Sequence, residues 1–514
     1  MSILQEPLNK SLEADVAIIG GGIVGACIAR ELSQYKVETV LIEKYELNAG
    51  QSRGTLGLTY WGGLGEVGSS ILKSVIAPGS PLYDPESIRL RLQEKGYYMW
   101  FQRLLELDID YKFVKNLIIA TNEEELKLLD NMHKLSFEIG PFYMDHRYIE
   151  RDEILEIEPA VTKDVIRGLV DSGRLTFRAF PPEMTYALVE NAQQNGVEIV
   201  EDAEVTGITH NGGAQVIHTR RGDIKANFVV NAAGRFADEI ARMGGHCDWK
   251  IELFKCPLIV MDKSLPRINN FTMLPPIPGR PLVLSPTNEG NTFVVAGLYT
   301  KVYDRHDLST DRESINYAIN EAHRISPSIT HQGIIRSFGG LRAVNNRNPE
   351  ENIIEFAPDN PKFLNCAIRL PGMAQAPGVA DYVLDRLGNH GLEMVKKSDF
   401  NPYRTKIPRF RELSDFYRRQ LIEKDPRYGH VVCRCETITE GEICEAIRRG
   451  ARSVDSVKMR CRAGMGRCQG GFCGPRVVSI LARELGIPEE QIRQKEEGTF
   501  VVPYGSKELS LRSQ

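Results

Sequence analysis

Residues 15–44 constrain the fold of this 514-residue chain more than any other stretch. They open with an apolar, β-branched run at 16–19, which is too short for a helix and suits a buried parallel strand. A glycine-rich turn follows, then helix-forming residues at 26–32 and a second apolar run at 38–42. This order of strand, turn, helix and strand predicts the first unit of a Rossmann-like domain.

The glycine-rich turn has the pattern G-x-G-x-x-G, formed by Gly20, Gly22 and Gly25. The first glycine permits a tight turn, the second lets a pyrophosphate approach the backbone, and the third lets the helix pack closely on the strand. Glu43 ends the second strand, where a carboxylate accepts hydrogen bonds from ribose hydroxyls. We therefore predict a dinucleotide site, with an ordinary tight turn as the alternative. The motif alone does not distinguish FAD from NAD.

Composition predicts a globular protein of two or three domains. The net charge of −4 is small for this length, which argues against nucleic acid or another polyanion as a partner. No apolar run approaches the about 20 residues that a membrane span requires. Residues 1–14 are polar and lack the order of a signal peptide, so we interpret them as a leader and expect a cytoplasmic protein.

Several segments between the two ends are suited to surround a ligand. The loop at 48–70 is rich in Gly, Ser and Thr, and its Tyr60 and Trp61 are pocket candidates together with His331. The apolar strand predicted at 228–234 ends in small residues that would allow a cofactor to lie against it. Alternating residues between 250 and 300 predict a separate antiparallel sheet.

Further predictions concern local structure. Helices are predicted at 85–107, 123–135, 151–159 and 182–195, and a hairpin at 205–208 and 215–219. Residues 168–180 are predicted to be rich in turns, and residues 387–428 to be a linker with solvated charges.

Six of the ten cysteines lie near the C-terminal end: Cys433, Cys435, Cys444, Cys461, Cys468 and Cys473. A secreted disulfide scaffold would spread its cysteines through a short chain, so we interpret this cluster as a metal site in a reducing compartment. Two close pairs of thiolates suit an iron–sulfur cluster or a structural zinc ion, and the spacing leaves both open. We expect Cys444, inside a helix predicted at 439–450 with a capping box, to be a packed core thiol. Cys461 is either an adjacent free thiol or a further ligand.

These motifs resemble two known families. Residues 15 to about 387 resemble the D-amino-acid-oxidase-like FAD-dependent oxidoreductases, in the segments VAIIGGGIVGACIARELS with Glu43, FVVNAAGRFADEIA, SFGGLR and LPGMAQAPGVA. Residues 430–486, with CRCETITEGEI and AGMGRCQGGFC, resemble the bacterioferritin-associated-ferredoxin type of [2Fe-2S] domain. The joined arrangement is similar to the large subunit of anaerobic glycerol-3-phosphate dehydrogenase and its relatives.

The resemblance implies an α/β protein with a Rossmann-like FAD-binding domain, an inserted antiparallel-sheet substrate domain and a small helical C-terminal [2Fe-2S] domain. The expected division is leader 1–14, FAD-binding 15–92, 147–244 and 333–390, substrate domain 93–146 and 245–332, linker 391–428, [2Fe-2S] domain 429–486 and tail 487–514.

The resemblance also assigns roles to individual residues. It places the FAD pyrophosphate at Gly20, Gly22 and Gly25, the ribose at Glu43, adenine at Val205, the dinucleotide between Ala233 and Gly234, and the flavin near Ser52, Arg53, Gly372 and Met373. Cys433, Cys435, Cys468 and Cys473 match the ligands of the [2Fe-2S] cluster. Arg342 matches the arginine that faces substrate, and Tyr60 and His331 are further catalytic candidates.

We therefore expect an FAD-dependent dehydrogenase that oxidises a small anionic hydroxy or amino compound. Electrons would pass from FAD through the [2Fe-2S] cluster to an acceptor protein or a quinone-linked subunit, in a hetero-oligomer that is cytoplasmic or peripheral on the inner membrane face. The segments TLGLTYWGG, SFGGLRAV and RLTFRAFPPEMTYAL differ from the usual pattern of glycerol-phosphate enzymes, so the sequence leaves the substrate open. The alternatives are an amino-acid oxidase with a structural metal module, and an electron-relay subunit of a larger dehydrogenase.

Overall fold

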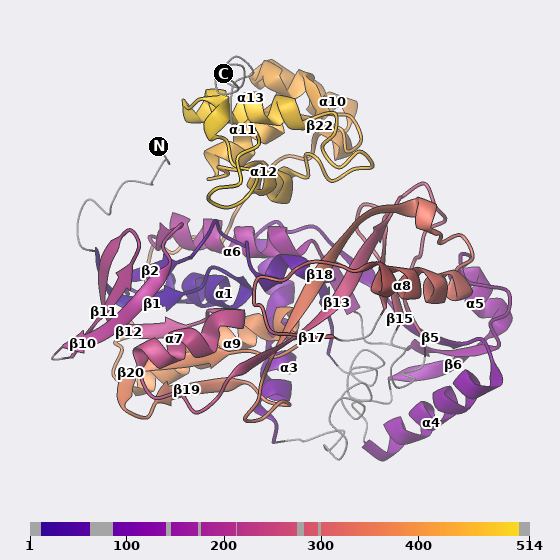
Figure 1. The fold of residues 1–514 in the computed structure, drawn as a ribbon, viewed down its shortest axis with the longest axis horizontal. Coiled ribbons are helices and arrows are strands. Elements are labelled where there is room, and N and C mark those ends of the chain that lie inside the picture. Colours follow the sequence, from indigo (N-terminus) through magenta and orange to yellow (C-terminus); the bar gives the residue numbers. More distant parts are fainter. Residues whose placement is uncertain are drawn as a thin grey trace, which may run out of the picture.

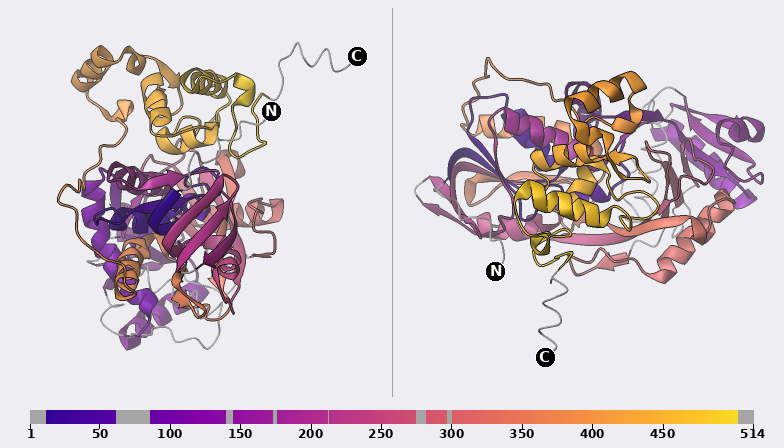
Figure 2. Two further views of the ribbon diagram at one scale, coloured as in Figure 1. Left: turned by 90° about the vertical axis from the view of Figure 1, so that its left-hand side faces the viewer. Right: turned by 90° about the horizontal axis from the view of Figure 1, so that it is seen from above.

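The computed structural model describes residues 12–61, 86–139, 145–172, 176–211, 213–274, 282–296 and 300–502. Two large sheets lie side by side, and a helical C-terminal unit covers one end of them (Figures 1 and 2). Most of the predicted leader and the end of the predicted tail lie outside the described residues. None of the described helices has the length and apolar character that a membrane crossing requires.

The first sheet forms the Rossmann-like domain and confirms the predicted order of elements. β1 (Leu12–Ile19) pairs in parallel with β2 (Thr39–Ile42) and with β12 (Gly222–Asn231), and α1 (Ile23–Leu32) connects β1 to β2. The predicted hairpin is present as β10 and β11. The other strands of this sheet are β9 (Glu198–Val200), β10 (Val205–Asn211), β11 (Ala214–Thr219), β19 (Ile353–Ala357) and β20 (Asn360–Ala367).

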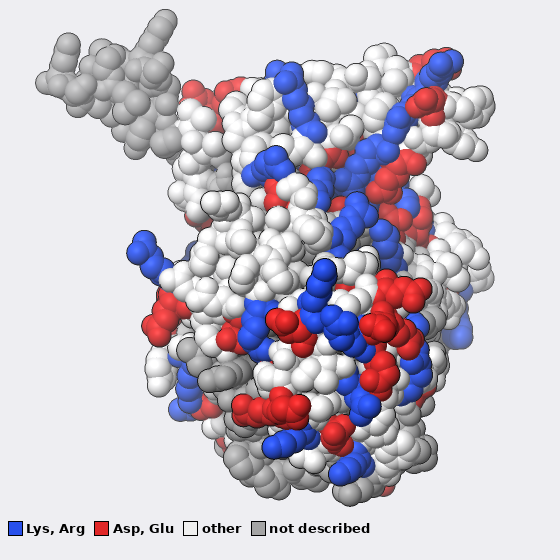
Figure 3. Space-filling view, turned by 90° about the vertical axis from the view of Figure 1, so that its right-hand side faces the viewer, with Lys and Arg blue, Asp and Glu red and all other residues white. Residues whose placement is uncertain are grey.

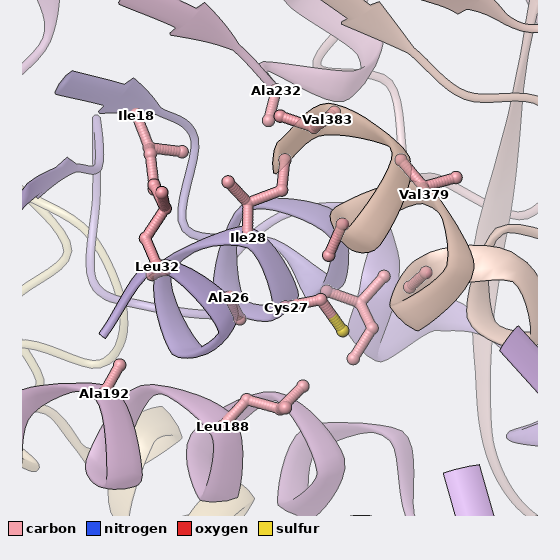
Figure 4. Close-up of a cluster of buried hydrophobic side chains, with 14 of the residues drawn as sticks. Ile18, Ala26, Cys27, Ile28, Leu32, Leu188, Ala192, Ala232, Val379 and Val383 are labelled. Carbon is pink, nitrogen blue, oxygen red and sulfur yellow. The ribbon is translucent and has the colours of Figure 1, made fainter. Parts of the chain in front are cut away.

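The core of this domain lies around α1. The helix is sandwiched between α6 (Pro181–Gln194) and α9 (Gly372–Asn389), so its small and branched side chains are buried on every side (Figure 4). α3 (Ile88–Glu106) packs on α9 at a close approach, because a Cβ on Gly378 would lie 2.2 Å from the Leu92 carbonyl oxygen. The whole of α3 therefore packs on the FAD-binding domain, whereas the division predicted at residue 93 would cut this helix.

The second sheet confirms the predicted antiparallel sheet, apart from one parallel pair between β5 and β14. Its strands are β5 (Asn116–Ala120), β6 (His146–Glu150), β7 (Arg167–Asp171), β13 (Ile251–Met261), β14 (Phe271–Met273), β15 (Leu282–Pro286), β16 (Thr292–Ala296), β17 (Thr300–Val302) and β18 (Ile334–Asn345). The helices α4 (Glu123–Ile139), α5 (Arg151–Ile157) and α8 (Arg312–Ile325) pack on it. α7 (Ala237–Gly244) lies on the first sheet.

The segment predicted to be rich in turns, 168–180, instead contains two strands. β7 lies between β5 and β6, while β8 (Thr176–Ala179) joins β3 (Leu58–Thr59) and β4 (Tyr111–Val114) in a small sheet. Gly168 is needed for close packing within the sheet, since a Cβ there would lie 2.7 Å from the Ile118 carbonyl oxygen. β6, β7 and β18 all belong to the second sheet, so the chain passes between the domains more often than the predicted division allows.

The C-terminal unit has a hydrophobic core of its own. It contains β21 (Val431–Cys433), β22 (Ile438–Thr439), α11 (Glu440–Arg448), α12 (Val454–Cys461) and α13 (Gly474–Leu485). Thr439 and Glu442 form the predicted capping box at the start of α11. α12, which was not predicted from the sequence, begins with a second capping box between Ser453 and Ser456.

The segment predicted as a solvated linker is instead held against the FAD-binding domain. Arg404 donates to Glu190 at 2.6 Å, and Arg409 donates to Glu183 at 2.7 Å. The segment also contains the helix α10 (Asp415–Lys424). Sequence alone could not pair these cations, because their partners lie more than 200 residues away, at separations of 214 and 226.

Glu190 of α6 joins three parts of the molecule through arginines. Its carboxylate accepts hydrogen bonds from Arg404 at 2.6 Å, Arg449 at 3.0 Å and Arg460 at 2.8 Å, the last two from the [2Fe-2S] domain. Burial alone would raise the pKa of Glu190, but the three guanidinium groups lower it below its usual value. Lys and Arg side chains gather with acidic ones at the waist between the C-terminal unit and the rest (Figure 3).

We expect Glu190→Gln to destabilise the docking of the C-terminal unit by about 3 kcal/mol, because it leaves buried guanidinium groups without their carboxylate. Denaturant unfolding, followed at the absorbance of the [2Fe-2S] cluster that the resemblance implies for this unit, would show an earlier transition. Since the folded-state pKa is lowered, the contribution of Glu190 is present above the unfolded-state pKa and is lost as the pH falls through the folded-state value. Glu153→Gln, which removes the exposed partner of Arg147, is the matched control and should change little. Equal effects of the two substitutions would contradict this role.

Candidate cofactor and substrate sites

A cavity of about 470 Å³ runs from the first sheet to the second. At one end it is lined by residues at the carboxyl ends of β1, β2 and β12, where α/β sheets commonly bind dinucleotides. At the other end it is lined by strands of the antiparallel sheet. The cavity therefore extends from the predicted cofactor-binding end to the predicted substrate end.

Two glycines of the first turn, Gly20 and Gly25, leave no room for side chains. Gly20 has φ +114°, and a Cβ there would lie 2.5 Å from the Ala232 carbonyl oxygen. A Cβ on Gly25 would lie 2.0 Å from the Gly20 carbonyl oxygen, so α1 approaches β1 only because this residue is glycine. Gly22 lines the cavity at the start of α1, and the hydroxyl of Ser52 accepts a hydrogen bond from the Ile23 N–H at 2.9 Å. This cradle fits a pyrophosphate at a helix N-terminus.

Glu43 lies beside this cradle, at the end of β2. Its carboxylate accepts hydrogen bonds from the Gly21 N–H at 2.7 Å and the Tyr45 N–H at 3.0 Å. Burial raises its pKa to about 6. Each carboxylate oxygen of Glu43 can accept one more hydrogen bond. Two ribose hydroxyls could therefore donate to this carboxylate. Val205, Ala233 and Gly234 line the same end.

Arg235, at this end of the cavity, was not predicted from the sequence. Only 6% of the residue is exposed, and its Nε has no hydrogen-bond partner among the described residues. Burial lowers the pKa of its guanidinium. The sequence did contain a clue to this residue, because Arg235 directly follows the small residues after β12, a position where a cation could meet a phosphate.

The other end of the cavity holds the predicted substrate-facing arginine. Arg342 of β18 and Tyr60 line it, and Gly372 and Met373 stand at the start of α9. A Cβ on Gly372 would meet no atom of the described residues within 4 Å, so this helix start faces open space. The remaining walls of this end are mainly apolar: Ile118, Leu258, Phe271, Leu274, Leu282, Val283 and Val295. Arg369, also missed, lines the cavity and pairs with Glu350 at 2.6 Å.

Three other candidates are absent from the cavity lining. Arg53, expected in the loop near the flavin, lies between Ser52 and Gly54, which line the cavity, and its own side chain forms an ion pair with Asp455 of the C-terminal unit. His331 is exposed, and its Nε2 lies 2.9 Å from the Asn316 side-chain oxygen, away from the cavity walls. Trp61 is buried in the core of the first domain. The prediction of His331 as a pocket residue is therefore wrong.

The four predicted cluster cysteines converge as two pairs. The Sγ atoms of Cys435 and Cys468 lie 3.7 Å apart, and the thiol of Cys473 is hydrogen-bonded to Cys433. Within the described chain, no three His, Cys, Asp or Glu side chains lie so that they could hold a single metal ion. Two pairs of thiolates match the donor set of a [2Fe-2S] cluster, which is ligated by four cysteines.

Backbone N–H groups surround these sulfur atoms. Cys433 accepts a hydrogen bond from the thiol of Cys473 and further ones from the backbone N–H groups of Gly464 and Glu436. Together these hydrogen bonds lower the pKa of Cys433 to about 6. The N–H of Phe472 lowers the pKa of Cys468. Hydrogen bonds of this kind stabilise thiolate over thiol and tune the potential of a bound cluster. The residues present therefore fit the cluster.

The other two cysteines of this unit are packed into its core. Cys461 in α12 donates a hydrogen bond to the Val457 carbonyl oxygen at 3.2 Å, and burial raises the pKa of its thiol. Cys444 in α11 is buried, with a pKa raised to about 11 by that burial. Cys468, in contrast, is exposed and marks the outer edge of the cluster site.

Comparisons with known proteins agree with this geometry. The family model described as FAD dependent oxidoreductase matches residues 15–386, and the one described as BFD-like [2Fe-2S] binding domain matches residues 431–483. Glycerol 3-phosphate dehydrogenase of Caloramator mitchellensis is 36% identical over 95% of this chain and 98% of its own. One subunit of the anaerobic glycerol-3-phosphate dehydrogenase of Escherichia coli K12 is 25% identical over 92% of this chain and 89% of its own.

Solved structures show the same fold for the first two domains. The L-alpha-glycerophosphate oxidase of Mycoplasma pneumoniae with FAD bound has a TM-score of 0.66 at 24% identity, covering 76% of this chain and 98% of its own. Glycine oxidase of Geobacillus kaustophilus has a TM-score of 0.60 at 20% identity, covering 77% of this chain and 100% of its own. The chain therefore belongs to the FAD-dependent oxidoreductases, with FAD and a [2Fe-2S] cluster, held by its C-terminal BFD-like domain, as cofactors.

Proposed function

We propose that this protein is a glycerol-3-phosphate dehydrogenase that delivers electrons through its [2Fe-2S] domain to a partner acceptor. The observation that carries the proposal is Arg342, a cation at the substrate end of a cavity whose walls there are mainly apolar. The names of relatives at 36% and 25% identity support this choice of substrate.

Arg342 would bind the phosphate. A guanidinium presents parallel N–H donors that match two phosphate oxygens, so it holds the substrate in one orientation. The surrounding apolar walls exclude water and strengthen this ion pair. Tyr60 lines the same end and offers a polar group to the carbon-bound hydroxyls.

The start of α9 would orient the reacting part of the cofactor. Gly372 and Met373 line the cavity beside the substrate end, and the backbone of Gly372 is open to it. Bound FAD supplies the acceptor for hydride from a carbon that carries a hydroxyl, and the [2Fe-2S] cluster supplies a one-electron carrier. The protein contributes position, charge and exclusion of water.

The surface around Cys468 is suited to receive the acceptor. Cys468 is exposed, and the adjacent Phe472 ring is 43% exposed with the guanidiniums of Arg434 and Arg476 at 4.5 Å and 5.0 Å from its centroid. A flat ring between two cations favours a partner protein that presents carboxylates. Electrons would leave the chain at this edge.

An anaerobic titration tests the substrate. We expect glycerol 3-phosphate to bleach the flavin absorbance of the purified protein, followed by reduction of the cluster. Glycine and L-proline are the comparison substrates. Bleaching by an amino acid and not by glycerol 3-phosphate would assign the protein to the amine-oxidising class instead.

Reoxidation tests the route of the electrons. We expect the substrate-reduced protein to reduce a one-electron acceptor faster than it reduces oxygen. Rapid reaction of the reduced flavin with oxygen, without any reduction of the cluster, would favour an oxidase in which the C-terminal unit is structural.

A further inference from the structure

A second cavity of about 440 Å³ lies where the FAD-binding, substrate and [2Fe-2S] domains meet. Its walls come from the short helix η1 (Gln51–Gly54), from β18, from α12 and from the loop that leads to Cys468. Gly54, Leu56 and Leu341 line both this cavity and the first one. The second cavity therefore lies between the cofactor-binding region and the loop that carries a cluster ligand.

Cations outnumber acids in its walls. The cations are Arg53, Arg178, Arg336, Lys458, Arg462 and Lys495, and the acids are Glu289 and Asp455. Both acids are already engaged, because Asp455 pairs with Arg53 and Glu289 lies 3.3 Å from Arg462. The cavity therefore carries an excess of positive charge.

Two of these cations are buried and form no salt bridge among the described residues, although Arg178 feels the charge of Glu289 and Lys458 that of Asp455, acids that already pair with other arginines. Arg178 is 7% exposed; its Nε donates to the Asn288 side-chain oxygen at 3.0 Å, and its Nη1 has no hydrogen-bond partner in the part of the chain that the structure describes. Lys458 is 8% exposed, and its Nζ meets the Gln469 side-chain oxygen at 3.5 Å. Burial lowers the pKa of Arg178 to about 10 and, with Arg336 nearby, that of Lys458 to about 8. Buried charges in proteins are normally paired.

Aromatic and sulfur-containing side chains line the rest of the space: Phe180, Phe293, Phe338, Met459 and Met465. Walls of this kind suit the apolar or ring-containing body of a ligand, while the cations suit its charged group. Arg336, which is exposed, donates to the same Gln469 oxygen at 3.2 Å and extends the positive charge to the surface. An anion would therefore meet cations from the surface inward.

We propose that this interdomain cavity is a binding site for a phosphate group, held by Arg178 and Lys458. The phosphate is either free or part of a small organic molecule whose body lies against the phenylalanines. Binding there contacts all three domains at once, so it stabilises the docked position of the [2Fe-2S] domain. The site is separate from the substrate end of the first cavity, where Arg342 lies.

Isothermal titration calorimetry of the FAD-loaded, cluster-loaded protein tests this site, with inorganic phosphate and ADP as probes and no substrate present. We expect wild-type protein to bind at least one probe. Arg178→Gln and Lys458→Met should each weaken binding by about 10- to 100-fold, as expected for loss of one buried charged contact. Lys225→Met, on the exposed part of β12, is the matched control and should leave binding unchanged. Retention of the flavin spectrum shows that ADP has not displaced FAD.

The two probes distinguish the sources of the phosphate. Tighter binding of ADP than of inorganic phosphate supports an organic ligand, and equal binding or binding of inorganic phosphate alone supports free phosphate. If neither probe binds, the proposal is overturned. It is also overturned if a probe binds and neither Arg178→Gln nor Lys458→Met weakens that binding. Calorimetry requires no turnover, so these outcomes are independent of the proposed dehydrogenase activity. Because Lys458 is buried and forms no salt bridge among the described residues, Lys458→Met should fold, and Arg178→Gln tests the same site through a second residue.

Discussion

Replacing Cys468 with serine is expected to abolish the absorption and paramagnetic signals of the [2Fe-2S] cluster while FAD stays bound. Cys468 is one of four thiols that converge, with its Sγ 3.7 Å from that of Cys435. A hydroxyl is a harder and far less acidic ligand than a thiol, so it replaces thiolate poorly on iron. None of the described residues that line the first cavity belongs to the [2Fe-2S] domain, since the last of them in the sequence is Met373. The substitution therefore removes nothing from the FAD-binding residues.

The same variant separates the two halves of the proposed reaction. Substrate should still bleach the flavin anaerobically, whereas reduction of a one-electron acceptor should fall to background. Cys461→Ser is the matched control, because serine can keep the hydrogen bond to the Val457 carbonyl oxygen and the thiol is packed in the hydrophobic core of the C-terminal unit. Loss of the cluster in Cys461→Ser, with its retention in Cys468→Ser, would show that the ligand set is assigned wrongly.

The elements that sequence predicted correctly are those whose causes are local. The first βαβ unit rests on short-range periodicity and on glycines whose neighbours leave no space for a Cβ. The capping box joins Thr439 and Glu442, which are only three positions apart. In such cases the residues that determine the structure lie within one window of sequence, so a single chain suffices to predict it.

The predictions that failed depend on distant partners. β7 pairs with β5 as well as with the nearer β6, and β8 pairs with β3 and β4, and nothing within 168–180 indicates those partners. The contact between Arg53 and Asp455 joins residues 402 positions apart and was likewise not predicted. The sequence around a charged residue does not indicate which distant residue it will pair with. The interdomain contacts and the second cavity could therefore not be predicted from the sequence.

Arg342→Ala is expected to raise the KM for glycerol 3-phosphate by about 100-fold, with a smaller change in kcat. Removing one partner of a desolvated charge pair costs about 2–5 kcal/mol, and each 1.4 kcal/mol corresponds to about tenfold in affinity. The contact to phosphate lies away from the reacting carbon, so it contributes to binding in the ground state and the transition state alike. Steady-state kinetics with the cluster-loaded protein measure both constants.

Two further variants make this result specific to the guanidinium. Arg342→Lys keeps the charge but loses the parallel pair of donors, so its KM should lie between those of wild type and Arg342→Ala. Arg347→Ala removes an exposed arginine just beyond β18, paired with Asp248 and Glu355, and should leave KM unchanged. An unchanged KM in Arg342→Ala would remove this residue from substrate binding. A fall in kcat alone would instead mean that Arg342 acts on the reacting atoms, because uniform binding alters KM and leaves the chemical step untouched.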